Sequence, residues 1–177
     1  MKEIDLDTAI VLGSPYPYTL VSTLDKQGKP NIMGVSWWSF TCFQPPMMAV
    51  VIGHARYTHE CIENCREFVI CLPSKEQAKV AWLCGTKSGR DTDKLTATGL
   101  SVVPSKVVSP PIIDGAAVAY ECKVLAQMEC GDHTLYNSDI VAIHGDLQRA
   151  EHLYSIHYRK LLSIDYQGAT DFGIEYK

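Results

Sequence analysis

The stretch 18-YTLVSTLDKQGKPNIMGVSWWSF-40 contains two strand-like segments around a turn. Residues 18–24 and 32–40 are rich in β-branched and aromatic side chains, which favour pleated strands. Gly28 and Pro30 lie between them in a polar segment that has the composition of a turn. The stretch therefore predicts an antiparallel hairpin at the start of a mainly β fold.

Further apolar segments extend this pattern along the chain. The first follows the break at 45-PP-46 and is apolar on both faces, as in a strand of a closed or covered sheet. The last two flank Gly131 and Asp132, which suggests a long β-ribbon. The expected strands are 47-MMAVVIG-53, 68-FVICLP-73, 116-AAVAYECKVLAQMEC-130 and 133-HTLYNSDIVAIHGDL-147. Together they predict an antiparallel β-barrel.

Small helices are expected to cover the ends of this barrel. One begins near Thr58. Another spans 75–85, with Ser74 as its N-cap and Gly85 as its C-cap. The list is completed by a short helix around Leu95 and one within 152-HLYSIHYRKLL-162. We expect one domain over 1–177, with a barrel core at about 16–147 and a C-terminal arm at 148–177.

Composition limits the possible functions. The chain has 177 residues and a formal net charge of -4, which argues against a nucleic-acid partner held by a basic surface. Its seven scattered cysteines suit a reducing cytoplasm better than a disulfide framework. The N-terminal residues lack the pattern of a signal peptide, and no apolar run is long enough to span a bilayer. We therefore expect a cytoplasmic protein without a membrane partner.

A metal site is one alternative suggested by the cysteines. Cys61 and Cys65 would share a helix face, with His54 and His59 nearby. The short-spaced Cys pairs of structural zinc sites are missing, and single cysteines on apolar faces usually pack as small hydrophobic residues. We predict no bound metal.

The segment 54-HARYTHECIENC-65 places Arg56, Tyr57 and Thr58 together where a helix begins. Unpaired backbone N–H groups and a partial positive charge at a helix N-terminus favour a bound phosphate. The alternative is that Thr58 only caps the helix and Arg56 is a solvated charge.

A later loop, 88-SGRDTDK-94, offers a second set of phosphate-binding groups. Ser88, Gly89, Arg90 and Lys94 provide a hydroxyl, a flexible backbone and two cations. By itself the loop favours the interpretation of a solvated surface. Combined with the helix start, it suits a phosphorylated ligand.

The segment 31-NIMGVSWWS-39 supplies a surface for a flat ring. Trp37 and Trp38 would point to opposite faces of the strand, and Gly34 would allow close approach to the backbone. Ser36 and Ser39 add hydroxyls. The alternative is a core tryptophan beside a surface one.

These motifs, in this order, resemble the flavin reductase-like family of FMN-binding split barrels, which includes flavoredoxins. The resemblance extends from about Tyr16 to about Leu147. It depends on the order of its elements: PxTLVST with DxxGxPN, NxMGVSWW, the PP break, the RYT turn, SGRDTDK, and GDH before a long strand.

The resemblance implies a bound FMN. Its phosphate end would be surrounded by Arg56, Tyr57, Thr58, Ser88, Gly89, Arg90 and Lys94. Its ring and ribityl chain would lie along Asn31, Met33, Ser36, Trp37 and Ser39. It also implies a homodimer, and it makes His133 the catalytic candidate, on the side of the flavin where a nicotinamide would bind.

The implied function is that of an FMN-dependent oxidoreductase, either a flavin reductase or a flavoredoxin-like electron carrier. Electrons would come from NADH, NADPH or a redox protein. A separate dinucleotide-binding motif GxGxxG and a nucleophile motif GxSxG are both missing from the sequence. The alternative is a non-enzymatic module that holds a flavin or haem.

Overall fold

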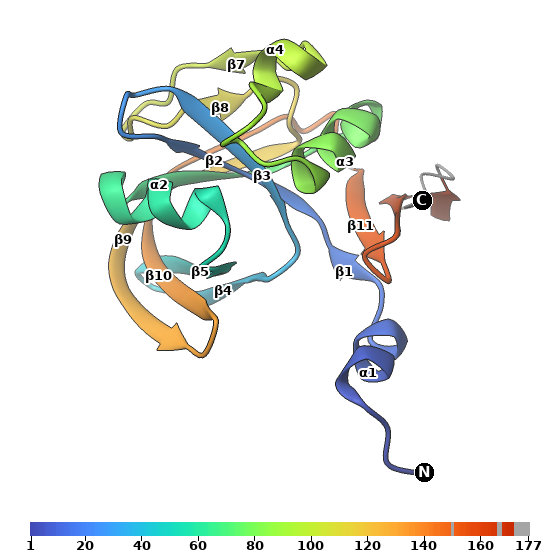
Figure 1. The fold of residues 1–177 in the computed structure, drawn as a ribbon. Helices are drawn as coiled ribbons and strands as arrows, with labels where there is room; N and C mark the ends of the chain where they lie inside the picture. The colour runs from blue at the N-terminus through green and yellow to red at the C-terminus, as the bar shows by residue number, and fades with distance from the viewer. Residues whose placement is uncertain (150, 166–167, 172–177) are drawn as a thin grey trace.

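The computed structural model describes residues 1–149, 151–165 and 168–171 (Figure 1). The helical elements are α1 (Leu6–Leu12), α2 (Tyr57–Cys65), the 3₁₀ turn η1 (Lys75–Gln77), α3 (Ala78–Thr86) and α4 (Lys94–Thr98). The strands are β1 (Tyr16–Pro17), β2 (Thr19–Leu24), β3 (Pro30–Val35), β4 (Trp38–Phe43), β5 (Pro46–Gly53), β6 (Glu67–Leu72), β7 (Val102–Val103), β8 (Ile112–Ile113), β9 (Val118–Cys130), β10 (His133–Gly145), β11 (His152–Ile156), β12 (Lys160–Asp165) and β13 (Gly168–Asp171).

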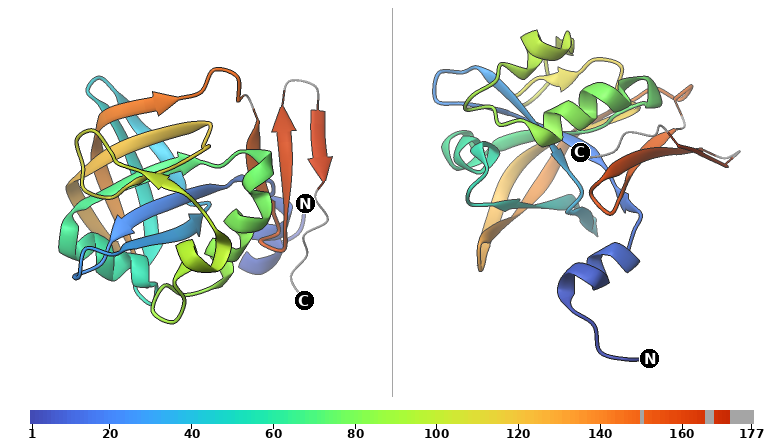
Figure 2. Two further views of the ribbon diagram at one scale, coloured as in Figure 1. Left: turned by 90° about the horizontal axis from the view of Figure 1, so that it is seen from above. Right: turned by 45° about the vertical axis from the view of Figure 1, so that its right-hand side comes forward.

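A seven-stranded antiparallel sheet in the order β3-β2-β6-β9-β10-β5-β4 forms the main body. Its two edge strands, β3 and β4, are separated by only Ser36 and Trp37. The sheet must therefore curl until its edges approach each other (Figures 1 and 2). The expectation of one continuous strand over 32–40 is wrong, because the chain changes from one edge to the other at this point.

Two of the expected hairpins are confirmed. β2 pairs with β3 from Thr19 opposite Val35 to Leu24 opposite Pro30. β9 and β10 form the long ribbon, and Gly131 in its tight turn has a φ of 65°. Glycine adopts this left-handed conformation without a steric penalty, which explains its place in the turn.

The C-terminal arm forms a second sheet, in the order β1-β11-β12-β13, beside the barrel (Figure 2). The expected helix within 152–162 is wrong, because β11 and β12 occupy this segment. Leu153, Ser155, Leu161 and Ser163 are buried. This period of two is that of strands, and the pairing partner β1 comes from the other end of the chain.

Helix α3 covers one end of the barrel close to β3. Ser74 caps the preceding 3₁₀ turn in a capping box with Gln77, as expected for an N-cap. Gly85 is not the C-cap, since the helix continues to Thr86. A Cβ at Gly85 would lie 2.2 Å from the Tyr18 hydroxyl, so glycine is needed there for close packing.

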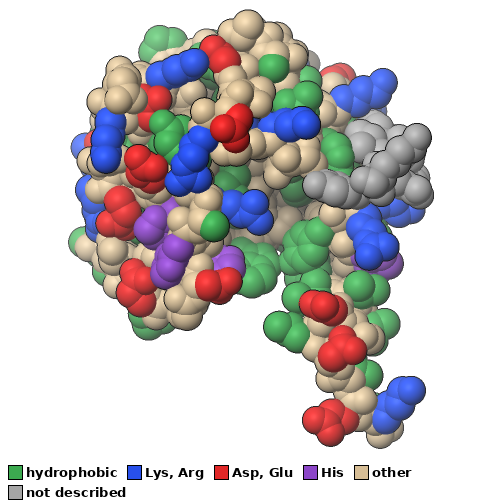
Figure 3. Space-filling model, viewed as in Figure 1, with side chains coloured by type: hydrophobic (Ala, Val, Ile, Leu, Met, Phe, Trp, Pro, Cys, Tyr) green, Lys and Arg blue, Asp and Glu red, His purple; other side chains and the backbone are tan. Residues whose placement is uncertain are grey.

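Helix α1 extends away from the body, and none of its residues is buried (Figures 1 and 3). Leu6 and Leu12 on this helix are 73% and 71% exposed. In the part of the chain that the structure describes, no helix has the length and apolar character needed to cross a membrane.

Candidate functional site

Three residues separate the start of helix α2 from the end of β5. Arg56 occupies the N-cap position with extended backbone angles, but its side chain does not cap the helix. Thr58 is not the cap either. Its side chain is buried, and its Oγ1 accepts a 2.9 Å hydrogen bond from Asn31 Nδ2. Both side chains therefore remain available for a role other than capping.

Lys94, the first residue of α4, is only 6% exposed. Its Nζ donates hydrogen bonds of 2.6 Å to the Ile32 carbonyl and 2.7 Å to the Cys84 carbonyl. Burial lowers the pKa of Lys94 below its ordinary value. Among the described residues, no carboxylate forms an ion pair with this ammonium group. A buried cation with only carbonyl partners is stabilised by a bound anion.

A small cavity of about 170 Å³ joins the three segments singled out in the sequence. Its lining includes Asn31 and Met33 from β3, Arg56, Tyr57 and Thr58 from the α2 start, and Ser88, Gly89 and Lys94 from the later loop. Three segments that are distant in sequence therefore meet around one cavity. The ligand of that site is a separate question.

Asn31 and Gly89 determine the shape of this small cavity. A Cβ at Gly89 would lie 2.0 Å from Asn31 Oδ1, so only glycine fits there without moving the amide. Asn31 Oδ1 itself is buried and has no hydrogen-bond partner among the described residues. Buried acceptors of this kind are rare, and a ligand hydroxyl or amide could satisfy this one.

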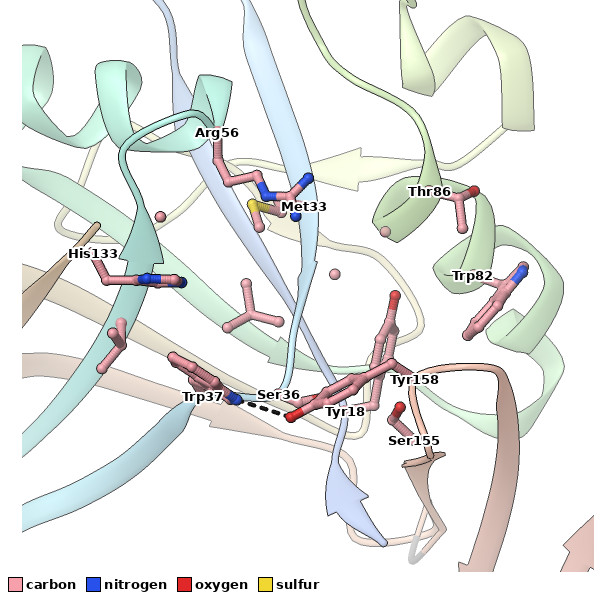
Figure 4. Close-up of a pocket in the computed structure, with 15 residues that line it drawn as sticks. Tyr18, Met33, Ser36, Trp37, Arg56, Trp82, Thr86, His133, Ser155 and Tyr158 are labelled. Carbon is pink, nitrogen blue, oxygen red and sulfur yellow. Dashed lines mark hydrogen bonds between the residues drawn. The ribbon is translucent and has the colours of Figure 1, made fainter. Parts of the chain in front are cut away.

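A larger cavity of about 400 Å³ adjoins the small one, because Met33 and Arg56 line both (Figure 4). Ser36, Trp37 and His133 also line it. Its volume falls within the range of small-molecule sites, and aromatic side chains form much of its wall.

His133 lies at one end of this larger cavity (Figure 4). Its ring stacks on Trp37 with 4.9 Å between the ring centroids. Nδ1 of His133 lies 2.7 Å from Asp132 Oδ1, and this hydrogen bond lowers the pKa of Asp132. The carboxylate thus orients the ring, which leaves Nε2 as the nitrogen without that restraint.

Two predicted site residues lie outside both cavities. Ser39 is exposed on β4, and its hydroxyl donates to the Phe40 carbonyl. Arg90 donates to the Ala55 carbonyl at 3.0 Å and packs over the Tyr57 ring at 5.2 Å. Arg90 therefore supports the cavity wall, whereas Ser39 has no contact with it.

Gly34 lines the larger cavity, but the glycine is required by a neighbouring side chain and not, as expected from the sequence, by a ligand ring. A Cβ at this position would lie 1.8 Å from the Tyr18 hydroxyl. The close approach permitted by this glycine is therefore that of the Tyr18 side chain. Tyr18 in turn donates to the Ala81 carbonyl at 3.1 Å, which joins the junction between β1 and β2 to α3.

Sequence reasoning missed several residues that line the larger cavity. They are Tyr18, Trp82, Thr86, Ser155 and Tyr158. These residues had no local signal, because the β1–β2 junction, α3 and the β11–β12 hairpin reach the site only through tertiary packing.

A phosphorylated, flat cofactor fits this arrangement. The Arg56 side chain has no recorded partner among the described residues, and Lys94 has no carboxylate. Aromatic side chains and the buried, unpartnered hydroxyl of Ser36 lie in the adjoining cavity. In the described parts of the chain, no group of three or more His, Cys, Asp or Glu side chains is placed to hold a metal ion.

Solved structures with the same architecture define the class of fold. Flavoredoxin of Desulfovibrio vulgaris (Miyazaki F) is 28% identical, with a TM-score of 0.80 over 98% of each chain. A protein of Shewanella frigidimarina with a split barrel domain is 18% identical, with a TM-score of 0.81 over 90% of this chain and 87% of that chain. This chain therefore has the split-barrel fold, as expected.

Sequence comparison identifies the family. The profile of the flavin reductase like domain matches residues 12–162. A protein of Archaeoglobus fulgidus is 40% identical over 130 residues, which are 73% of this chain and 72% of that protein. The chain belongs to the flavin reductase-like family, and this membership supports a redox function that involves a flavin.

Proposed function

We propose that this protein is an FMN-dependent oxidoreductase that exchanges electrons through a bound FMN. The observation that carries the proposal is the meeting of Arg56 and Lys94 at one small cavity beside a larger aromatic one. Two cations without carboxylate partners among the described residues suit a phosphate, and the aromatic walls suit a ring. The likeness to a flavoredoxin supports a flavin cofactor.

In this proposal, the phosphate would be held by Arg56, Thr58, Ser88, Gly89 and Lys94. Asn31 faces the polar chain between phosphate and ring. Ser36, Trp37 and His133 border the ring. FMN supplies the redox chemistry when bound, whereas the protein determines its orientation, its electrostatic surroundings and its access to solvent.

We propose NADH, NADPH or a redox protein as the source of electrons. His133 and Trp37 line the larger cavity, and Trp37 is 43% exposed, so a flat donor could reach the ring directly. His133 Nε2 is suited to hydrogen-bond such a donor, since Asp132 engages the other ring nitrogen.

We further propose that the protein is a cytoplasmic homodimer. Its cysteines are all free, which suits a reducing compartment. Exposed apolar side chains occur on β4, β9 and β10, and on the projecting α1: Phe43, Leu125, Met128, Ile143 and Leu12. A short helix with no buried residue needs a partner surface, and a second copy would provide one. Light scattering after size-exclusion chromatography measures the oligomeric state.

The absorption spectrum of the purified protein tests the cofactor. We expect flavin bands, either as purified or after incubation with FMN and removal of the excess. A Soret band would instead indicate haem, and a colourless protein after incubation would contradict the proposal.

Anaerobic mixing of the FMN-loaded protein with NADH and with NADPH tests the donor. Bleaching of the flavin bands by either one indicates direct reduction. If neither bleaches them while dithionite does, the protein is a carrier that depends on a redox partner.

A further inference from the structure

The turn between β11 and β12 carries Tyr158 into the larger cavity (Figure 4). His157 and Tyr158 have φ values of 51° and 54°, a conformation that residues with a Cβ adopt rarely. Such a turn persists only where surrounding contacts stabilise it. The backbone N–H of His157 donates a 2.9 Å hydrogen bond to Ser14 Oγ, which fixes the backbone of the turn, and the contacts of Tyr158 decide where its own side chain lies.

Few contacts hold Tyr158 in place. Its ring stacks on Tyr16 with 5.4 Å between the centroids. Its hydroxyl accepts a 2.9 Å hydrogen bond from Trp37 Nε1, which is drawn as the dashed line in Figure 4. The base of the hairpin is firmly packed, since Leu153 and Leu161 are buried, but Tyr158 itself is 38% exposed. The Tyr158 side chain can therefore rotate away from Trp37 without unfolding the sheet.

Buried hydroxyls without partners lie next to this turn. Ser155 is 1% exposed, and its Oγ has no hydrogen-bond partner in the part of the chain described by the structure. The Ser36 hydroxyl, in the link between β3 and β4, also borders the cavity, and it is buried without a hydrogen-bond partner among the described residues. A buried polar group left unpaired destabilises the closed arrangement, and a ligand atom could satisfy it.

The chemistry of the groups around Tyr158 defines which ligand would fit in this part of the larger cavity. Trp37 and Trp82 provide flat apolar surfaces on opposite sides of the cavity (Figure 4). Indole Nε1 is only a donor, so a molecule that replaces Tyr158 as its partner must bring an acceptor. The Ser155 hydroxyl can then donate or accept. This combination selects a planar aromatic ring that carries a carbonyl or carboxamide.

We propose that Tyr158 is a gate residue, whose release from Trp37 opens a second ligand place for a planar aromatic amide beside Ser155. This inference rests on the proposed function, because the amide would be the molecule that exchanges electrons with the cofactor. The closed state is the one with the Trp37–Tyr158 hydrogen bond. The ligand binds the open state, so weakening this bond raises its apparent affinity.

The test uses benzamide as the planar probe and cyclohexanecarboxamide as a non-planar control with the same amide. Binding is followed by the indole N–H resonance of Trp37 in a proton–nitrogen correlation spectrum, assigned with Trp37→Phe. The measurement is made with and without added FMN. Benzamide should move this resonance at concentrations at which the control leaves it in place.

Three variants make the test specific. Tyr158→Phe keeps the ring but lacks the hydroxyl, and should tighten benzamide binding about fivefold, the effect of removing one competing hydrogen bond. Tyr154→Phe, on the adjoining strand β11 but not among the cavity-lining residues, should leave the affinity unchanged. Ser155→Ala should weaken benzamide binding about fivefold while the Trp37 resonance of the free protein stays in place.

Equal benzamide affinities for Tyr158→Phe and Tyr154→Phe would contradict the proposed gate role of Tyr158. A Trp37 resonance that does not respond to benzamide would contradict it as well. A parallel FMN titration separates this result from the proposed function. If FMN fails to bind while the benzamide results hold, the cofactor assignment is wrong and the gate stands. If FMN binds and the benzamide results fail, only the gate is wrong.

Discussion

Asn31 Nδ2 on β3 donates a 2.9 Å hydrogen bond to Thr58 Oγ1 in the first turn of α2. Because the Thr58 oxygen accepts this bond, its own proton is left to donate elsewhere. The small cavity lies next to it, so the amide of Asn31 directs the hydroxyl toward the proposed phosphate.

Thr58→Val should therefore weaken FMN binding about tenfold or more, since a hydrogen bond to a charged group contributes about 1.5–3 kcal/mol. Riboflavin lacks the phosphate, so its affinity should stay nearly constant. Fluorescence titration with both flavins measures the difference. Thr58→Ser keeps the hydroxyl and is the control, and an equal loss for both flavins would argue against a phosphate contact.

Arg56 should contribute through its charge. Arg56→Ala is expected to lower FMN affinity by about tenfold or more and to reduce its dependence on salt. Arg66→Gln is the matched control, because Arg66 lies at the other end of α2 and contacts Glu63 and Gln127. Titrations at low and high salt measure both effects. An unchanged FMN affinity in Arg56→Ala would remove the phosphate role of this residue.

His133→Ala should slow reduction of the bound flavin by NADH or NADPH about tenfold or more while FMN affinity changes little. His133→Phe keeps a ring to stack on Trp37 and separates packing from hydrogen bonding. Anaerobic stopped-flow absorbance gives the rates. Reduction at the parent rate in both variants would make His133 a structural residue.

The cysteines should differ sharply in reactivity. Burial raises the pKa of Cys61 to about 11, of Cys71 to about 12 and of Cys84 to about 11. At pH 8 a thiol with a pKa near 11 is about one-thousandth thiolate, so these groups should react with a disulfide reagent only after unfolding. Exposed Cys130 should react first, and Cys130→Ser should abolish the fast phase.

Glu121 should be a major source of stability. Its carboxylate is fully buried and accepts bonds from the backbone N–H groups of Lys106, Val107 and Val108, at 2.7, 2.6 and 3.0 Å, and lies 2.6 Å from His144 Nε2. Burial alone would raise the pKa of Glu121, but these hydrogen bonds outweigh it and lower the pKa. Glu121→Gln should cost about 3–5 kcal/mol of unfolding free energy at pH 7.

The pH dependence follows from the direction of that shift. A carboxylate with a lowered pKa in the folded state stabilises the protein above its unfolded pKa, and this stabilisation is lost as the pH falls through the folded value. The difference in stability between the parent and Glu121→Gln should therefore shrink below about pH 4. Urea unfolding across this range measures it, and a constant difference would contradict the ionised state of Glu121.

Much of the barrel could be predicted from local pattern. The β2–β3 hairpin and the β9–β10 ribbon follow from alternating apolar residues around turn residues. The break at Ser36 and Trp37 could not be predicted, because strand propensity continues through it. Only the need for the two sheet edges to meet interrupts the strand there.

The candidate site also has features that could be predicted from the sequence and features that could not. By itself, the sequence determined which short segments carry phosphate-binding and ring-binding side chains, since hydroxyls, cations and aromatic groups are local properties. Only the tertiary structure decided that Lys94 is buried against two carbonyls, that Ser39 lies elsewhere, and that Tyr158 enters the cavity. Those outcomes depend on contacts between segments distant in sequence, which local propensity does not encode.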